Sequence, residues 1–134
     1  YYNVTGQQNT TLGWRAGFGS VSGASVSTLT AIGYHAGVNI TTGHGNSFLG
    51  NSAGSGTTSG TENTAVGSLS FVDNTTGAGN VAVGRESLAN NTTASDNVAV
   101  GKLAMFTNTT GSQNTAVGTQ ALRLNTTAGE NVAV

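Results

Sequence analysis

Few side chains in this chain could do chemistry, and they are scattered. The two histidines, His35 and His44, are candidate metal ligands, but no Cys and no acidic cluster accompanies them. Glu62 and Glu86 lie more than one repeat apart, so they do not form the carboxylate pair of a glycosidase. Ser and Thr are abundant, but no general base and orienting group stand beside them. We therefore predict that the chain is not an enzyme and that it holds no metal or cofactor.

The composition excludes several partners. The 134 residues include 21 Gly, no Pro and no Cys, and only 7% of them are charged. A net charge of −1 gives no electrostatic reason for binding nucleic acid or an anionic membrane. No run of about 18 apolar residues is present, so we predict no membrane insertion. Without Cys there is no disulfide framework.

The elements that position these residues are dictated by an internal repeat. From Asn46 onward an Asn recurs at every seventeenth position, and the frame extends back to Leu29 and then to a longer coil that begins at Asn9. We place the three extra residues of that coil within 24–28. The chain is thus predicted to be one repeat domain over 1–134. Its parts are a partial coil 1–8, coils 9–28, 29–45, 46–62, 63–79, 80–96, 97–113 and 114–130, and a partial coil 131–134.

Numbered 1 to 17 from its Asn, each coil follows one pattern. Position 4 is aliphatic, position 5 is Gly, position 8 is small, and positions 12–15 read Asn-Thr-Thr-Gly or Asn-Thr-Thr-Ala in the later coils. Recurrent Gly and β-branched residues disfavour a helix. We predict one short strand at positions 2–4, a second at positions 7–10, and turns at Gly and Asn-Thr-Thr. The fold class is therefore all-β, a parallel β-solenoid or β-roll.

Stacked coils place equivalent residues above one another, which predicts structural ladders. The Asn ladder hydrogen-bonds its side-chain amides along the stack, Gly ends each strand, and Val lies in the core of the roll. The ladder residues are Asn46, Asn63, Asn80, Asn97, Asn114 and Asn131; Gly50, Gly67, Gly84, Gly101 and Gly118; and Val66, Val83, Val100 and Val117.

The strands carry apolar side chains on both faces. If positions 2 and 4 point into the core, position 3 points outward, where an exposed Ala116 would be tolerable but Phe48 would be costly. Phe48 lies in the coil that has Gly54 at position 9, so Phe48 is expected to fill the space that Gly54 leaves. Leu122 at position 9 raises the same question of a second covered face. Two buried faces on a thin roll favour a homo-oligomer.

Two further sets of residues have competing interpretations. Asn74, Asn91, Asn108 and Asn125 each begin an Asn-Thr-Thr sequon, which is either a glycosylation site or ordinary turn chemistry. Trp14, Tyr34 and His35 occupy positions 6 and 7 of neighbouring coils. They would form either a ligand patch for sugar rings or a surface that packs against a neighbouring domain or chain.

The segments "NTAVGSLSF", "NVAVGRESL", "NVAVGKLAM" and "NTAVGTQAL" resemble the head repeats of YadA-like trimeric autotransporter adhesins. The longer unit is similar to repeats in bacteriophage tail-fibre proteins. The resemblance covers the whole chain, most closely residues 63–134, although the adhesin repeat is shorter. It implies a left-handed parallel β-roll, a homotrimer and an extracellular location on a virion fibre or cell surface, with a host glycan or protein as receptor.

Three functions follow from these observations. The first is a non-enzymatic structural or adhesive segment of an extracellular fibre, either a phage tail fibre or a bacterial surface adhesin. The second is an extracellular filament subunit that associates end to end through open solenoid ends. The third is an ice-binding solenoid. It is disfavoured because the Thr residues at positions 13 and 14 are adjacent and should face opposite ways in an extended chain.

Overall fold

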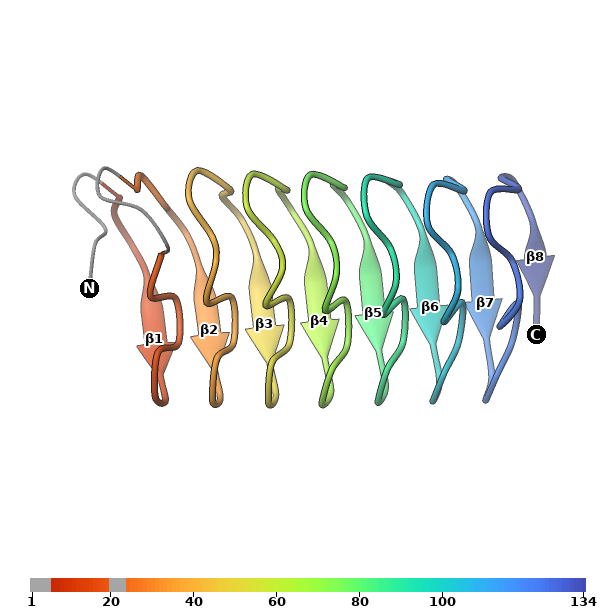
Figure 1. Cartoon of the computed structure of the whole chain (residues 1–134), viewed down its shortest axis with the longest axis horizontal. Helices are drawn as coiled ribbons and strands as arrows, with labels where there is room; N and C mark the ends of the chain where they lie inside the picture. The colour runs from red at the N-terminus through yellow and green to blue at the C-terminus, as the bar shows by residue number, and fades with distance from the viewer. Residues whose placement is uncertain (1–5, 20–23) are drawn as a thin grey trace.

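The structure is a computed structural model that describes residues 6–19 and 24–134. Over these residues the secondary structure is a series of short strands without a helix. The strands are β1 (Thr10–Leu12), β2 (Thr30–Ile32), β3 (Ser47–Leu49), β4 (Thr64–Val66), β5 (Val81–Val83), β6 (Val98–Val100), β7 (Thr115–Val117) and β8 (Val132–Ala133). Each strand pairs in parallel with the next one in the chain, so the sheet runs along the whole stack (Figure 1). The predicted all-β parallel solenoid is confirmed.

The strand register reproduces the repeat. Val81 pairs with Val98, the residue at the same position of the next coil, and Thr10 pairs with Thr30 across the longer first coil. The predicted coil length and the strand at positions 2–4 are therefore confirmed. Adjacent parallel strands lie about 4.8 Å apart, so an eight-stranded sheet, with its seven spacings, spans about 34 Å.

The position of the insertion in the first coil differs from the prediction. Asn63 donates from Nδ2 to the carbonyl of Gly77, at position 15 of its coil, over 2.9 Å. Asn9 makes the equivalent bond to the carbonyl of Val26 over 2.6 Å. Val26 therefore occupies position 15 of its coil. The three extra residues precede Val26, so they do not all lie within 24–28 as predicted. Residues 20–23, like residues 1–5 of the N-terminal partial coil, lie outside the described part of the chain.

The predicted second strand at positions 7–10 is wrong. Residues at positions 7 and 9 have left-handed backbone angles; in one coil these are Glu86 (φ 57°) and Leu88 (φ 47°). The Glu86 amide donates back to Ser68 of the preceding coil, and the Leu88 amide donates forward to Ala104 of the next one. In an extended strand, amides two residues apart would point to the same neighbour. This wall of the roll is therefore hydrogen-bonded between coils but built from turns.

The core lies between the strands and this wall, and it is only one side chain thick. Its strand side is formed by the buried alanines at position 3, such as Ala82 and Ala99, and its wall side by buried residues at position 9, such as Leu88 and Met105. The prediction that Val117 and its equivalents lie in the core is wrong. Because the large side chain at position 9 fills the interior, the facing strand residue must be small, and strand alternation turns position 4 outward.

The expected exchange between Phe48 and Gly54 is confirmed. Phe48 is fully buried at position 3. A Cβ atom added to Gly54 would lie 2.6 Å from Cδ1 and Cε1 of the Phe48 ring, and one added to Gly37 of the preceding coil would lie 2.9 Å from Cδ2. The Phe48 ring therefore occupies the interior space that position 9 fills in later coils.

Candidate functional site

The most regular feature of the molecule is a ladder of buried amides at position 1. Asn80 donates from its backbone N and from Nδ2 to Oδ1 of Asn63, over 3.0 and 3.1 Å. The same pair of bonds joins each Asn from Asn63 to Asn131 to the Asn one coil earlier. In each pair, the Oδ1 atom of one Asn accepts both hydrogen bonds from the Asn of the next coil. A buried amide without such partners would be costly, so these residues hold consecutive coils in register.

A second Asn ladder was missed by the sequence analysis, which treated position 12 only as a turn or a sequon. Asn91 donates from Nδ2 to Oδ1 of Asn74 over 3.1 Å, and Asn108 and Asn125 continue the series. The signal was present, since these residues recur with the same period as the first ladder. The side chains of Asn74, Asn91 and Asn108 are fully buried. A glycan on any of the three would break a rung of this ladder.

The position-1 ladder ends at the coil formed by residues 29–45, and the position-12 ladder ends one coil later in the sequence, at residues 46–62, where Thr57 takes the place of Asn and accepts from Asn74 over 3.5 Å. Leu29 takes the place of Asn at position 1 and Ile40 takes it at position 12, and both side chains are buried. The backbone N of Leu29 still donates to Oδ1 of the earlier Asn9, over 2.8 Å. This coil is an apolar layer between the irregular first coil and the regular stack from residue 46 onward.

The glycines at position 5 are required by the closeness of stacked backbones. A Cβ atom on Gly84 (φ +126°) would lie 2.6 Å from the carbonyl oxygen of Gly101, and one on Gly101 would lie 2.3 Å from that of Gly118. Gly50 and Gly67 meet the next coil in the same way. The predicted Gly column thus ends each strand and also permits the close contact between coils.

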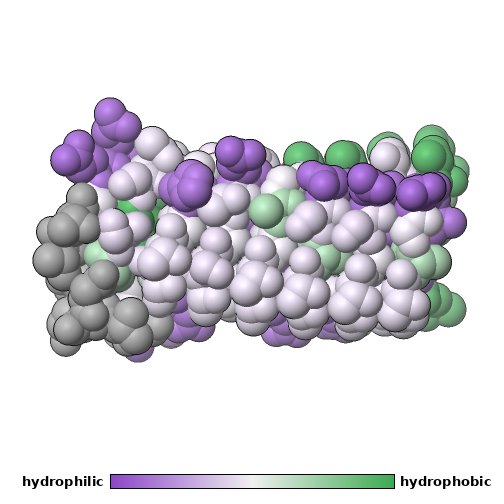
Figure 2. All heavy atoms as spheres, turned by 90° about the horizontal axis from the view of Figure 1, so that it is seen from above, coloured by the Kyte–Doolittle hydropathy of each residue, from purple (hydrophilic) through white to green (hydrophobic). Residues whose placement is uncertain are grey.

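Threonine forms a third column, on the outside. Thr75 at position 13 donates from its hydroxyl to the carbonyl of Thr92 over 3.0 Å, and the equivalent bond recurs in neighbouring coils. Thr75 and Thr76 are both exposed, whereas Thr58, Thr92 and Thr109 at position 13 are partly buried. Figure 2 shows rows of near-neutral side chains over the turns that precede the strands. Ice binding stays a prediction, for which thermal hysteresis is the measurement.

The outer face of the sheet carries an aliphatic residue at position 4 and Thr, Ser or Val at position 2, and among the described residues neither position holds a charge. We call it the outer sheet face. At position 4 of strands β1 to β7, Leu12 (68%), Leu49 (45%) and Val117 (38%) are exposed, and Val66, Val83 and Val100 are partly exposed. A row of exposed aliphatic side chains of this kind is typical of an interaction site.

Trp14, Tyr34 and His35 are brought together as a stack of rings, which we call the aromatic stack. The Trp14 and Tyr34 ring centroids lie 5.3 Å apart with an interplanar angle of 13°. His35 lies 4.1 Å from Tyr34 and 4.9 Å from Trp14, also nearly parallel. Trp14 is 60% and Tyr34 is 50% exposed. His35 Nε2 is buried without a hydrogen-bond partner.

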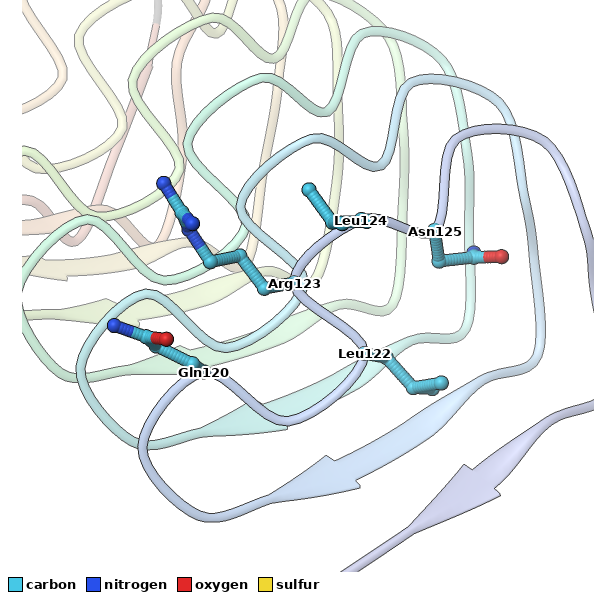
Figure 3. A pocket seen from close by; sticks show the side chains of 5 residues that line it. All are labelled: Gln120, Leu122, Arg123, Leu124 and Asn125. Carbon is cyan, nitrogen blue, oxygen red and sulfur yellow. The ribbon is translucent and has the colours of Figure 1, made fainter.

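The remaining chemistry-bearing residues do not converge. The described residues contain no group of three His, Asp, Glu or Cys side chains able to hold a metal ion, so neither His35 nor His44 is brought into such a group. Arg85 pairs with the adjacent Glu86. A hollow of about 560 Å³ opens on the last complete coil, beside Gln120, Leu122, Arg123, Leu124 and Asn125 (Figure 3). Leu122 is the position-9 residue of this coil, and in earlier coils the next coil stacks over that position.

No protein-family model, curated protein or solved structure matches this chain. In the part of the chain that the structure describes, there is no helix with the length and apolarity needed to cross a membrane. The ladders, the outer sheet face and the aromatic stack are therefore the features of the chain that bear on its function.

Proposed function

We propose that this chain is a non-enzymatic segment of an extracellular fibre, a phage tail fibre or a bacterial surface adhesin, and that it works as a left-handed homotrimeric rod. The observation that carries the proposal is the outer sheet face. A rod exposed to water on all sides would place polar residues at position 4 as well as at position 2. Position 2 is Thr or Ser in five of the eight strands, yet position 4 is aliphatic in every strand from β1 to β7. The resemblance of the repeats to trimeric adhesin heads and tail-fibre repeats supports the same conclusion.

The internal bonding suits a mechanical role. Two ladders of buried amides and a column of Thr hydroxyls join consecutive coils, in addition to the bonds of the sheet and of the turn-built wall. Each of these bonds runs from one coil to its neighbour along the stack. Bending the rod would lengthen many of them together, so the stack resists bending. A stiff rod can hold a binding surface away from a particle or cell.

Light scattering tests the proposal. Three chains of 13.2 kDa give a particle of about 40 kDa. The variant Val83→Lys/Val100→Lys places two charges on the outer sheet face and should release monomers, because burying unpaired charge is costly. The control Thr76→Lys/Thr93→Lys places the same charges on exposed turn residues and should remain trimeric. A wild-type chain that stays monomeric at micromolar concentration would remove the proposal.

A further inference from the structure

Repetition creates a problem for side-by-side association. Along the outer sheet face, positions 2 and 4 read Thr64 and Val66, Val81 and Val83, Val98 and Val100, and Thr115 and Val117 in successive coils. If one copy slid by a single coil, about 4.8 Å, it would meet nearly the same side chains. Register is weakly specified when neighbouring pairings are alike. The regular coils therefore cannot by themselves fix how copies are aligned along the rod.

The first two complete coils differ from the others at the surface. Position 6 is Trp14 and then Tyr34 in coils 9–28 and 29–45, whereas in the last five complete coils it is Asn51, Ser68, Arg85, Lys102 and Thr119. Trp14 follows the exposed Leu12 after one glycine, so the apolar surface continues from strand β1 into the turn. This aromatic surface occurs once along the rod, and a neighbour that slipped by one coil would place Asn51 opposite Tyr34.

The aromatic stack is held firmly. The three rings lie within 15° of parallel. The Arg15 guanidinium carbon lies 5.5 Å from the Trp14 ring centroid and 4.7 Å from that of Phe18, where it makes cation–π contacts with both. The rings cover one another's faces, so part of the surface that a stacking sugar would use is already occupied. A protein surface that packs against ring edges is the better partner.

We propose that the aromatic stack packs against the N-terminal coils of neighbouring copies of this chain and sets their axial register. This inference rests on the homo-oligomer proposed above. A second copy is the occupant that matches the surface in period and length. The strand residues at positions 2–4 form a face about 10 Å wide and about 34 Å long, or about 340 Å², so the turn residues that carry the aromatic stack are needed to approach the roughly 800 Å² that each partner buries in a standard interface.

Disulfide mapping between coils measures the register. The chain has no Cys, so single Cys residues can replace Val81, Val83, Val98 or Val100. Mixed single-Cys chains are associated, oxidised and digested with trypsin. Arg85 separates the peptide of the first two positions from that of the last two, so mass spectrometry distinguishes bonds within one coil level from bonds between levels. The wild-type background should give one coil offset.

The test variant is Trp14→Ser/Tyr34→Ser. Both side chains are largely exposed in the single chain, so its fold should persist. We expect the variant to remain oligomeric and to give two or more coil offsets. Leu124→Ser is the control, since Leu124 is 78% exposed at position 11 of its coil and should leave one offset. As a second measurement, emission of Trp14, the single tryptophan, should shift to the blue when wild-type chains associate.

The outcomes separate the two proposals. A monomeric wild-type chain refutes the fibre trimer itself. An oligomeric wild-type chain with several offsets, or a variant that keeps one offset, refutes the register role and leaves the trimer standing. A variant that no longer associates shows that the aromatic stack supplies association instead of alignment, which also overturns the inference.

Discussion

Phe48 and Gly54 offer a sharp test of how the core is filled. Replacing Phe48 with Ala empties the space between Gly37 and Gly54, and losses of about 3–5 kcal/mol are usual for such a change. Replacing Gly54 with Phe alone puts a Cβ atom 2.6 Å from the Phe48 ring. Overpacking costs about 1–3 kcal/mol, and an L residue in the left-handed conformation costs about 1–2 kcal/mol more.

The double variant Phe48→Ala/Gly54→Phe should recover most of this loss. It reproduces the neighbouring coil, where Ala65 faces the buried Phe71 at a left-handed position (φ 55°). If the two changes were independent, the loss would be about 5–10 kcal/mol. We expect a loss below about 3 kcal/mol, because the left-handed strain remains but the space is filled, and hence a coupling energy of at least about 2 kcal/mol.

Urea unfolding followed by circular dichroism, fitted for the wild type and the three variants, gives the free energies of the cycle. Phe48→Ala combined with Met105→Ala is the control pair, since these residues lie more than three coils apart and their effects should add within about 0.5 kcal/mol. Additive losses for Phe48→Ala and Gly54→Phe would refute the shared interior space.

Three further outcomes are expected. Asn97→Ala removes the oxygen that accepts two donors from Asn114, so the free energy of unfolding should fall by at least about 1–3 kcal/mol. Asn131→Ala, at a partly exposed rung, should lower it by about 1 kcal/mol or less. Equal losses of the two variants in urea titrations would contradict the role of the ladder. Gly84→Ala should destabilise the protein more than Gly118→Ala. Both glycines have positive φ, but a Cβ at Gly118 meets only the Ala121 methyl at 4.0 Å. Equal melting temperatures of the two variants would exclude close backbone contact as the reason for glycine at position 5. Protein purified from its native source should have the unmodified mass, since three sequon asparagines are buried in a ladder, and added hexosamine in the intact mass spectrum would show otherwise.

The period, the strand positions and the parallel stacking could be predicted because every stacked coil must repeat the same contacts. The direction in which Val and Ala point could not. Both are apolar, and only the size of the residue at position 9 decides which of them fits inside. Phe48 was the informative exception, since a large residue at position 3 coincided with Gly at position 9. The coil that contains Phe48 therefore indicated that position 3 faces the core, whereas the recurrence of Val at position 4 suggested that position 4 does.

The turn-built wall was unpredictable for a different reason. Leu69 and Leu88 are poor candidates for left-handed backbone, which costs an L residue about 1–2 kcal/mol, and propensity alone favours a strand there. Bonds to the coil on either side override that preference. The aromatic stack was predictable as a cluster, because equal positions of adjacent coils must meet. The cation–π contacts of Arg15 with Trp14 and Phe18 were not predicted, because Arg15 and Phe18 lie outside the set that periodicity singles out.

The position-1 asparagine ladder has a direction. The Oδ1 atom of each Asn accepts hydrogen bonds from the coil that follows it in the chain. A nascent chain leaving the ribosome therefore completes a coil that already displays the acceptor for the next. We expect the protein to assemble in the order of its synthesis, with each finished turn serving as the template for the one that emerges after it.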